Sequence, residues 1–332
     1  MPATLEVALL GCGGMGRTLG AAVSNVPRAR LTAVWDVAPE AAQAAGEKLG
    51  VPSTTDLEQI LQDASIGGVI VATPNFTHVD VVTRAAAAGK HVFCEKPLAL
   101  STADCDRMIA ATAAAGVHLC VGQVLRYLPV FDRIRTLIAE GAIGTPFAMR
   151  TSRLGGWGEV APWRQRRETS GGPLFEVNAH ELDFMRCVLG EPEAVFATGS
   201  QAVVRSTDYE DTAFVTVRFA GGGHGVLHAS IGAAGGGYTG TIQGTEGTLQ
   251  YTNWPSRIDI HRFGGERRTI TDSELESPDA HARELGHLVD AALDGTPPAI
   301  SGRDGRAAVA MAEAATRSMA TGQVVEIPPP PA

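Results

Sequence analysis

Two spacings of apolar residues alternate along the first 122 positions. Short continuous apolar runs, which are typical of buried strands, are separated by alanine-rich stretches with helical spacing. The predicted strands are Glu6–Leu10, Leu31–Trp35, Val69–Ala72, His91–Cys94 and His118–Val121. The predicted helices include Ala38–Leu49, Val79–Ala88 and Ala103–Ala115. Strands that alternate with helices predict an α/β domain with a doubly wound, parallel sheet.

The pattern changes from about Thr145 onward. Runs rich in Val, Thr and aromatic residues, interrupted by Gly, are typical of an antiparallel sheet joined by turns. The predicted strands include Phe147–Arg153, Thr212–Phe219, Gly225–Ile231 and Thr239–Gln243. Helices are predicted around Asn178–Leu189, Ala280–Leu293 and Arg303–Met319. We therefore expect two domains, over residues 1–122 and 123–332, with the last helix (303–319) packing near the first domain.

A glycine-rich GxGxxG segment follows the first predicted strand. It consists of Gly11, Cys12, Gly13, Gly14, Met15 and Gly16, and a helical pattern comes next. The first Gly of such a segment permits a tight turn, the second lets backbone approach a pyrophosphate, and the third lets the helix pack on the strand. The amino end of the helix then offers N–H groups to the phosphates. A structural glycine turn is the alternative, but the position between strand and helix favours a dinucleotide site in a Rossmann domain.

Asp36 ends the second predicted strand, twenty residues after Gly16. A carboxylate at this position accepts hydrogen bonds from the ribose hydroxyls of NAD and repels the 2′-phosphate of NADP. The following residues, 37–39, include no Arg or Lys that would bind that phosphate. We therefore expect NAD, rather than NADP, as the cofactor.

Polar residues also follow a later strand. Thr73, Pro74 and Asn75 come directly after Val69–Ala72, and His78 lies one turn into the next helix. Ligands of doubly wound sheets bind at the carboxyl ends of the strands, so these four residues are candidate cofactor contacts. A plain turn with a helix cap explains residues 73–75 equally well.

The tripeptide Glu95–Lys96–Pro97 follows the strand His91–Cys94 at the same edge of the predicted sheet. Because Pro97 fixes the backbone and cannot continue a ladder, this turn is expected to carry Lys96, with Glu95 beside it, to the cofactor. Hydride transfer at a carbon that bears oxygen requires a proton transfer or a cation that stabilises the alkoxide, and lysine suits both needs. Taken alone, the tripeptide fits a solvent-facing lysine better.

Composition narrows the class of protein. With 332 residues, 44% of them hydrophobic, the chain is long enough for two cores. The formal net charge of −9 argues against nucleic acid or an anionic membrane as a partner. Five widely spaced cysteines and no apparent signal peptide predict buried, reduced thiols in a soluble, cytoplasmic protein. Residues 108–125 are uncharged, but a helix end followed by a short strand explains them better than a membrane span.

Several of these segments together resemble the glucose-fructose oxidoreductase/inositol dehydrogenase (Gfo/Idh/MocA) family. They are Gly11–Gly16, residues 85–100 (AAAAGKHVFCEKPLAL), Gln123–Pro129, Gly171–Gly190 and Ser301–Arg306. The resemblance implies an NAD- or NADP-binding Rossmann domain and a C-terminal domain whose large open sheet binds a sugar or polyol and forms a homodimer or homotetramer. It also implies a catalytic Lys96 and a cis peptide bond between Lys96 and Pro97.

The segment GGPLFEVNAHELDFMRCVLG, residues 171–190, carries the remaining catalytic candidates. Glu176 and His180 are four apart and would share one face of a helix. Two ligands are too few for a catalytic zinc site, so we expect no metal. The resemblance makes His180 the acid/base, and a neutral imidazole suits that role. The chain has Glu176 where the family pattern has Asp, and Asn178, a candidate substrate contact, where it has Gly.

Other candidates have structural alternatives. The resemblance implies that Gln123 contacts the cofactor and Arg126 the substrate. Trp163 and Arg164 lie in a Gly- and Arg-rich loop and are candidates for a sugar pocket, because aromatic faces stack on sugar rings; a loop anchor is an equal alternative. Asp183 is either a brace for the helix or an ordinary polar position.

Taken together, the sequence predicts an NAD-dependent dehydrogenase that oxidises a secondary alcohol of a sugar, inositol or related polyol, or reduces the matching ketone. Two alternatives stay open. One is an NAD-dependent glycosidase that oxidises its sugar only transiently, and the other is a non-catalytic sugar or dinucleotide sensor on the same fold. Retention of Lys96, Glu176 and His180 argues against the sensor.

Overall fold

The computed structural model describes residues 3–156, 158, 160–265, 267–276 and 278–329. Contacts divide the chain into two units, and each contains two stretches of sequence. Unit 1 comprises Met1–Val124 and Asp279–Arg306, and unit 2 comprises Leu125–Pro278 and Ala307–Ala332. The division therefore differs from a single boundary after residue 122, because a late segment of the chain returns to unit 1.

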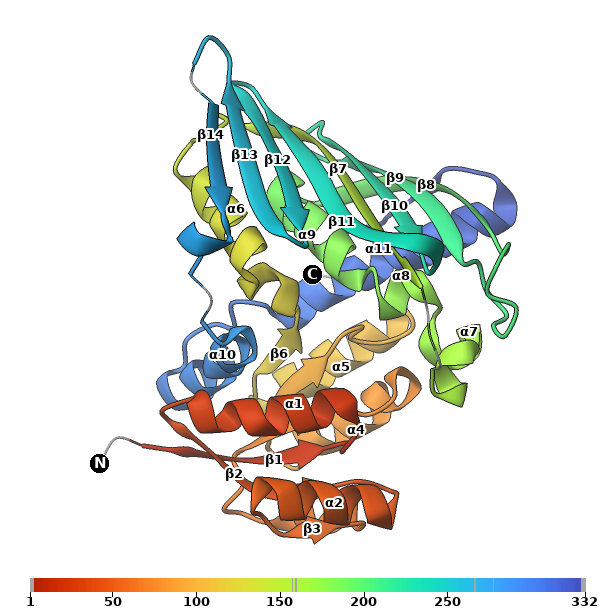
Figure 1. The fold of residues 1–332 in the computed structure, drawn as a ribbon. Coiled ribbons are helices and arrows are strands. Elements are labelled where there is room, and N and C mark those ends of the chain that lie inside the picture. The colour runs from red at the N-terminus through yellow and green to blue at the C-terminus, as the bar shows by residue number, and fades with distance from the viewer. Residues whose placement is uncertain (1–2, 157, 159, 266, 277, 330–332) are drawn as a thin grey trace. The chain divides into compact units, whose positions relative to one another are not determined.

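A six-stranded parallel sheet forms the centre of unit 1 (Figure 1), in the order β3-β2-β1-β4-β5-β6. The strands are β1 (Leu5–Leu10), β2 (Ala29–Trp35), β3 (Ser53–Thr54), β4 (Gly68–Val71), β5 (His91–Glu95) and β6 (Leu119–Gly122). Every neighbouring pair is parallel. The predicted doubly wound Rossmann sheet is confirmed, and β3 is added to its edge.

Helices connect these strands and cover both faces of the sheet. They are α1 (Gly14–Ala22), α2 (Pro39–Leu49), α3 (Leu57–Gln62), α4 (His78–Ala87), α5 (Thr102–Ala115) and α10 (Ala280–Asp294). Helix α1 packs against α2 and α10, while α4 packs against α5. Right-handed crossovers put these two groups on opposite faces, because the chain leaves β1 in one direction and β4 in the other.

Helix α10 completes the core of unit 1, although it lies far along the chain. Leu285, Leu288 and Val289 share one hydrophobic cluster with residues of β1 and β5, such as Leu9 and Phe93. Asp279 caps the helix by accepting hydrogen bonds from two N–H groups of its first turn. The late return of the chain therefore adds an apolar face that the first 124 residues lack.

A nine-stranded sheet dominates unit 2, in the order β14-β13-β12-β11-β7-β10-β9-β8-β15. Its strands are β7 (Pro146–Gly156), β8 (Pro192–Ser200), β9 (Thr212–Phe219), β10 (His224–Ser230), β11 (Gly232–Gly244), β12 (Gly247–Asn253), β13 (Ser256–Arg262), β14 (Arg267–Thr271) and β15 (Val325–Glu326). All pairs are antiparallel except β7 with β10. The predicted large, mostly antiparallel sheet is confirmed.

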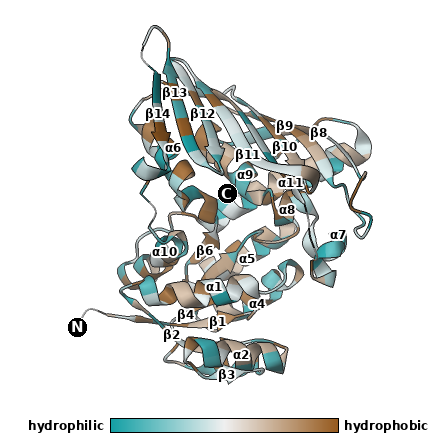
Figure 2. Ribbon diagram, in the orientation of Figure 1, coloured by the Kyte–Doolittle hydropathy of each residue, from teal (hydrophilic) through white to brown (hydrophobic). Residues whose placement is uncertain are grey.

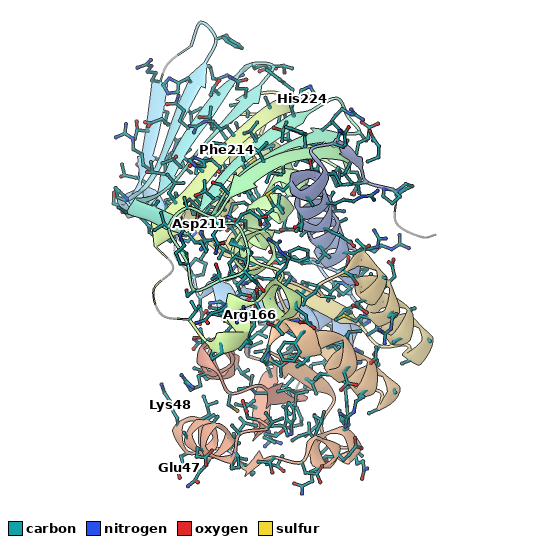
Figure 3. All side chains as sticks on the ribbon, turned by 90° about the vertical axis from the view of Figure 1, so that its right-hand side faces the viewer. Glu47, Lys48, Arg166, Asp211, Phe214 and His224 are labelled. Carbon is teal, nitrogen blue, oxygen red and sulfur yellow. The ribbon has the colours of Figure 1, made fainter. Side chains whose placement is uncertain are left out.

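Helices cover one face of this sheet, and the other face is exposed. The helices of unit 2 are α6 (Pro129–Ala139), α7 (Arg167–Ser170), α8 (Pro173–Glu176), α9 (Ala179–Leu189) and most of α11 (Gly302–Thr321). Helix α9 packs on β7 and β10, and α6 packs on β12 and β13. Alternate residues of β9 are buried, as in a half-covered antiparallel sheet. Figure 3 labels Phe214 and His224 on β9 and β10.

The hydropathy of the residues agrees with their burial. In Figure 2 the buried strand β6 is apolar, whereas the partly exposed helix α2 carries both polar and apolar stretches. Four cysteines (Cys12, Cys94, Cys105 and Cys120) are free and buried, as predicted, but Cys187 on α9 is exposed, because it lies on the helix face away from the sheet. No helix among the described residues combines the length and the apolarity needed to cross a bilayer.

Candidate active site

The three glycines of the GxGxxG segment have the three different surroundings that dinucleotide binding requires. Gly11 has a φ of +98°, and a Cβ there would lie 2.6 Å from the carbonyl oxygen of Ala72. A Cβ on Gly16 would lie 1.8 Å from the Gly11 carbonyl oxygen, so helix α1 packs directly on the turn. A Cβ on Gly13 would meet nothing within 4 Å. The open space at Gly13 fits a pyrophosphate against the backbone.

Asp36 is anchored beside this turn by backbone hydrogen bonds. The Cys12 N–H donates to Oδ2 over 2.7 Å, and the Ala38 N–H donates to Oδ1 over 2.9 Å. The carboxylate is half-buried, and each oxygen keeps a second acceptor position. This orientation fits the predicted contact with the hydroxyls of an adenosine ribose. The same carboxylate, after burial, raises the pKa of the Cys12 thiol to about 11, so this cysteine is not a nucleophile.

The turn after β4 holds the residues Thr73, Pro74 and Asn75, and the last of these begins a short 3-10 helix, Asn75–Thr77. Asn75 is 5% exposed, and His78 has no exposed surface at all. The Thr77 hydroxyl donates to the Thr73 hydroxyl and to the Pro74 carbonyl oxygen over 2.7 Å each. These hydrogen bonds hold the turn, and the predicted contact of the buried His78 with the cofactor stays a prediction.

The turn after β5 has the predicted form. The peptide bond between Lys96 and Pro97 is cis, as expected. Glu95 is buried, and the Lys96 N–H donates to its Oε2 over 3.1 Å. Gln123 follows β6 and is 1% exposed. Because all strands of this sheet are parallel, the turns after β1, β2, β4, β5 and β6 lie at one edge. The structure thus gathers the predicted cofactor residues of unit 1 at that edge.

Two buried carboxyl groups, those of Glu95 and Glu284, have raised pKa values. Burial raises the pKa of Glu95 to about 8, and the charge of Glu284 on α10 adds to the shift, while Lys96 and His281 oppose it. Burial also raises the pKa of Glu284, with a further contribution from Asp279. Glu284 Oε1 lies 2.9 Å from His281 Nδ1, whereas its Oε2 is buried with no hydrogen-bond partner among the described residues. The end of β5 therefore favours neutral carboxyl groups.

The segment of unit 2 that carries Glu176 and His180 is not one continuous helix. Helix α8 ends at Glu176 and α9 begins at Ala179, so the predicted helical face that these two residues were expected to share is wrong. The chain turns at Val177 and Asn178, and the Asn178 carbonyl oxygen begins α9 by accepting a hydrogen bond from the Leu182 N–H. His180 lies in the first turn of α9 and is half-buried.

Glu176 is instead paired with the predicted sugar-binding loop. Its Oε1 lies 2.9 Å from a guanidinium nitrogen of Arg164, and the carboxylate is buried. The Arg164 guanidinium also lies over the Trp163 ring, 5.1 Å from its centroid. Arg164 Nε is buried without a hydrogen-bond partner among the described residues. Three of the predicted residues of unit 2 therefore form one cluster.

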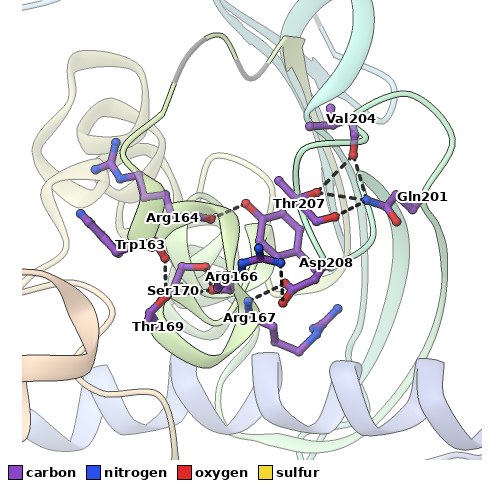
Figure 4. A network of polar contacts seen from close by, with 11 residues as sticks. Trp163, Arg164, Arg166, Arg167, Thr169, Ser170, Gln201, Val204, Thr207 and Asp208 are labelled. Atoms are coloured by element: carbon purple, nitrogen blue, oxygen red, sulfur yellow. Dashed lines mark hydrogen bonds and ion pairs between the residues drawn. The ribbon is translucent and has the colours of Figure 1, made fainter.

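The loop behind this cluster is held by side chains from residues 201–209 (Figure 4). The Tyr209 hydroxyl donates to the Arg164 carbonyl oxygen over 2.5 Å, and the Arg167 N–H donates to Asp208 over 2.7 Å. The side chains of Trp163 and Arg164 extend away from that side of the loop. Hydrogen bonds therefore anchor the backbone of this loop, while the side chains of Trp163 and Arg164 project from it. The loop can be an anchor and a binding surface at once.

Arg126 and Asp183 form a buried, two-pronged ion pair, with Nε–Oδ2 and Nη2–Oδ1 distances of 2.7 and 2.6 Å. Asp183 therefore braces α9, as one interpretation of the sequence proposed. Asn178 donates to Glu181 over 2.9 Å, and Arg153 of β7 lies 3.1 Å from the other oxygen of Glu181. The contacts of Arg126 and Asn178 with substrate stay predictions.

The sequence analysis missed several residues of these sites. Glu284 had no signal near it in sequence, and Glu181 was overlooked although it directly follows His180. Val37 and Phe76, which are 75% and 48% exposed, follow Asp36 and Asn75 at the cofactor edge of unit 1. The sequence shows that these two apolar residues directly follow polar turn residues, but it does not show that they are exposed. No group of three His, Cys, Asp or Glu side chains suited to a metal ion occurs among the residues that the structure describes.

Comparison with known proteins agrees with this geometry. Residues 5–123 match the family described as "Oxidoreductase family, NAD-binding Rossmann fold" (GFO_IDH_MocA), and residues 131–250 match the GFO/IDH/MocA C-terminal domain. The chain belongs to the GFO/IDH/MocA family. It is an oxidoreductase with an NAD-binding Rossmann domain, so the predicted family, enzyme class and cofactor are confirmed.

Members of the family resemble the chain over its whole length. Myo-inositol 2-dehydrogenase of Thermotoga maritima is 31% identical, and the match covers 97% of this chain and 98% of that protein. Inositol 2-dehydrogenase of Rhizobium meliloti is 33% identical, with coverage of 98% and 99%. Levoglucosan dehydrogenase in complex with NADH superposes with a TM-score of 0.90 at 26% identity, covering 98% of this chain and 99% of that chain. GenD2 from gentamicin A biosynthesis, in complex with NAD, has a TM-score of 0.85 at 31% identity, covering 99% and 98%.

We predict that Asp36 determines the preference for NAD. Loss of a charge-assisted hydrogen bond costs about 1.5–3 kcal/mol, so Asp36→Ala should weaken NAD binding by roughly 10- to 100-fold and narrow the gap to NADP. Asp36→Asn keeps an acceptor for the Cys12 N–H. Comparing it with Asp36→Ala should therefore distinguish the effect of losing the charge from the effect of losing the hydrogen bond that holds the turn. Titration of both cofactors by fluorescence measures the change. Equal efficiency of NAD and NADP with the unmutated protein would contradict the assignment.

The buried carboxyl pair predicts a stability that falls as pH rises. Folding raises the pKa of Glu95 from its ordinary value to about 8. At pH values between these two, the carboxyl binds more protons in the native state than in the unfolded state, and this difference stabilises the native state. The free energy of unfolding should therefore decrease by about 1–3 kcal/mol from pH 5 to pH 8, since one pKa unit corresponds to about 1.4 kcal/mol. Glu284→Gln should make this decrease smaller.

The matched control is Glu47→Gln, a change at an exposed position of α2 that Figure 3 labels. It should leave the pH dependence as it is in the unmutated protein. Denaturant unfolding at several pH values measures all three proteins. Parallel curves for the unmutated protein and Glu284→Gln would show that the pair does not titrate in this range.

Proposed function

We propose that the protein is an NAD-dependent dehydrogenase that oxidises a secondary alcohol of a sugar, inositol or related polyol, or reduces the matching ketone. The observation that carries the proposal is the full-length similarity to two inositol 2-dehydrogenases in a chain that retains Lys96, Glu176 and His180. A similar structure, of a levoglucosan dehydrogenase, holds both NADH and levoglucosan, which supports a carbohydrate as the class of substrate.

The proposed roles follow from the chemistry of alcohol oxidation. Bound NAD supplies the acceptor for the hydride that leaves the substrate carbon. His180 takes the hydroxyl proton, which a neutral imidazole does well near neutral pH. Lys96 stabilises the developing negative charge on the substrate oxygen. Glu176 adjusts the electrostatics of this chemistry, and its carboxyl group lies 2.9 Å from a guanidinium nitrogen of Arg164.

Substrate binding is proposed for Trp163, Arg164 and Asn178, with Arg126 as a further contact. An aromatic ring covers the C–H face of a sugar, and a guanidinium donates to hydroxyl oxygens. The stacking of Arg164 on Trp163 presents both groups on one anchored loop, which supports this assignment. The remaining cofactor contacts are proposed for Gln123, Glu95 and the turns after β1 and β4.

A reaction without net oxidation is the second candidate. A 2,7-anhydro-N-acetylneuraminate hydratase of Mediterraneibacter gnavus is 32% identical, and the match covers 84% of this chain and 76% of that protein. The name describes a reaction that is not a net dehydrogenation. Net formation of NADH from a free sugar or polyol separates the first candidate from the second.

We also propose a cytoplasmic homodimer or homotetramer. Buried free thiols fit a reducing compartment. The exposed face of the nine-stranded sheet carries Phe196, Phe214 and Val226, which are 41%, 51% and 36% exposed. Registers of β8, β9 and β10 put these side chains on the same face. Such an apolar face is expected to be covered by a second copy of the chain.

A panel of sugars, inositols and polyols tests the function. With NAD, at least one free sugar or polyol should give steady NADH formation, followed by absorbance of the reduced cofactor. Lys96→Ala should lower kcat by about 100- to 1000-fold, because the lysine acts on charge that develops in the transition state. NAD affinity should change little, since the glycine turn and Asp36 bind the other half of the cofactor. Turnover of substrate without net NADH would favour the second candidate.

Light scattering tests the assembly. At micromolar concentration the protein should have the mass of a dimer or tetramer, and Phe214→Asp should shift it toward the monomer because a charge then enters the apolar face. Phe263→Asp is the matched control, at a position that is 77% exposed in the turn between β13 and β14. A monomeric unmutated protein would refute the proposed interface.

A further inference from the structure

The imidazole of His78 joins two turns at the cofactor edge of unit 1. Its Nδ1 lies 2.9 Å from the carbonyl oxygen of Pro97, and its Nε2 lies 3.0 Å from the carbonyl oxygen of Thr73. Thr73 belongs to the turn after β4, and Pro97 belongs to the turn after β5. The ring is completely buried. The side chain of His78 therefore links the turn after β4 to the turn after β5.

Both oxygens that the ring reaches are backbone carbonyls, which accept hydrogen bonds and do not donate them. A neutral imidazole has one N–H, so it would satisfy one carbonyl and turn a lone pair toward the other. An imidazolium has two N–H groups and satisfies both. Two contacts of 2.9 and 3.0 Å therefore point to a doubly protonated ring.

The charge of such a ring requires compensation. Burial disfavours a cation, and the amino end of α4, where His78 lies, carries a positive partial charge. Two charge-assisted hydrogen bonds to carbonyl oxygens offset these costs. The elements packed against α4, and α4 itself, bring the following titratable or charged groups: His91, Cys94 and Glu95 on β5, with Lys96 after it; Asp104, Cys105, Asp106 and Arg107 on α5; Asp80 and Arg84 on α4.

We propose that His78 is a positioning residue, which donates from both ring nitrogens and thereby fixes the Lys96–Pro97 turn against the Thr73 turn. This role rests on the proposed function of Lys96. The Pro97 carbonyl belongs to the residue next to Lys96, so holding it limits the positions that Lys96 adopts. A displacement of about 1 Å in a catalytic group lowers a rate by up to about 100-fold.

Nitrogen NMR of the NADH-bound protein, labelled with 15N-histidine, tests the double donation. Comparison with His78→Gln identifies the resonances of the ring. At pH 7 both nitrogens of His78 should have shifts of the protonated type and should couple to attached hydrogens. One unprotonated nitrogen would overturn the double donation. The measurement needs no sugar, so it stands even if every substrate in the panel fails and the proposed function is wrong.

Kinetics test the positioning role. His78→Phe removes both donors and should lower kcat by about 10- to 100-fold, with NADH affinity changed by less than about threefold. His78→Gln, whose amide reaches one carbonyl, should give an intermediate kcat. His91→Phe, at the other end of β5, is the matched control and should keep kcat within about twofold. If His78→Phe does not fold, the kcat of His78→Gln tests the positioning role instead. An unchanged kcat in the folded variants would overturn the role.

Discussion

Parallel pairing of the strands in unit 1 is the constraint on which the cofactor site depends. Because β1, β2, β4, β5 and β6 run in one direction, their carboxyl ends and the turns after them share an edge. Residues separated by more than one hundred positions, from Gly11 to Gln123, are thereby brought to one place. The hydrogen bond from the Cys12 N–H to Asp36 then ties the turn after β1 to the end of β2.

Burial of polar groups at this edge distinguishes the two halves of the cofactor site. Asp36 is half-buried and held by N–H groups, which suits a carboxylate that recognises hydroxyls. Glu95 is buried beside Glu284, in surroundings that favour its neutral form. Lys96 directly follows Glu95 in the sequence at the end of β5. In the proposed mechanism, a low-dielectric site strengthens the interaction of Lys96 with a developing alkoxide.

Local patterns predicted most of the fold and of the cofactor site. Continuous apolar runs marked β1, β4 and β5 because strands buried on both faces have few polar positions. The two-residue strands β3 and β15 and the outer strands β12 to β14 were missed, since short or half-exposed strands leave weak periodicity. Relations between distant residues were beyond the sequence. The sequence around Glu284 does not indicate that its charge acts on Glu95. The sequence around Asp183 likewise does not indicate its ion pair with Arg126. Both interactions arise only in the folded chain.

The break between α8 and α9 shows the same limit on a smaller scale. Spacing placed Glu176 and His180 on one helix face, but a turn at Asn178 separates them.

A structure of the protein with NADH bound tests the central claim most directly, which is that the nucleotide binds along the carboxyl edge of the six-stranded sheet. The account predicts that Asp36 contacts the adenosine ribose and that Lys96 Nζ lies within hydrogen-bond distance of the nicotinamide ribose. A nicotinamide bound away from the end of β5 would contradict it.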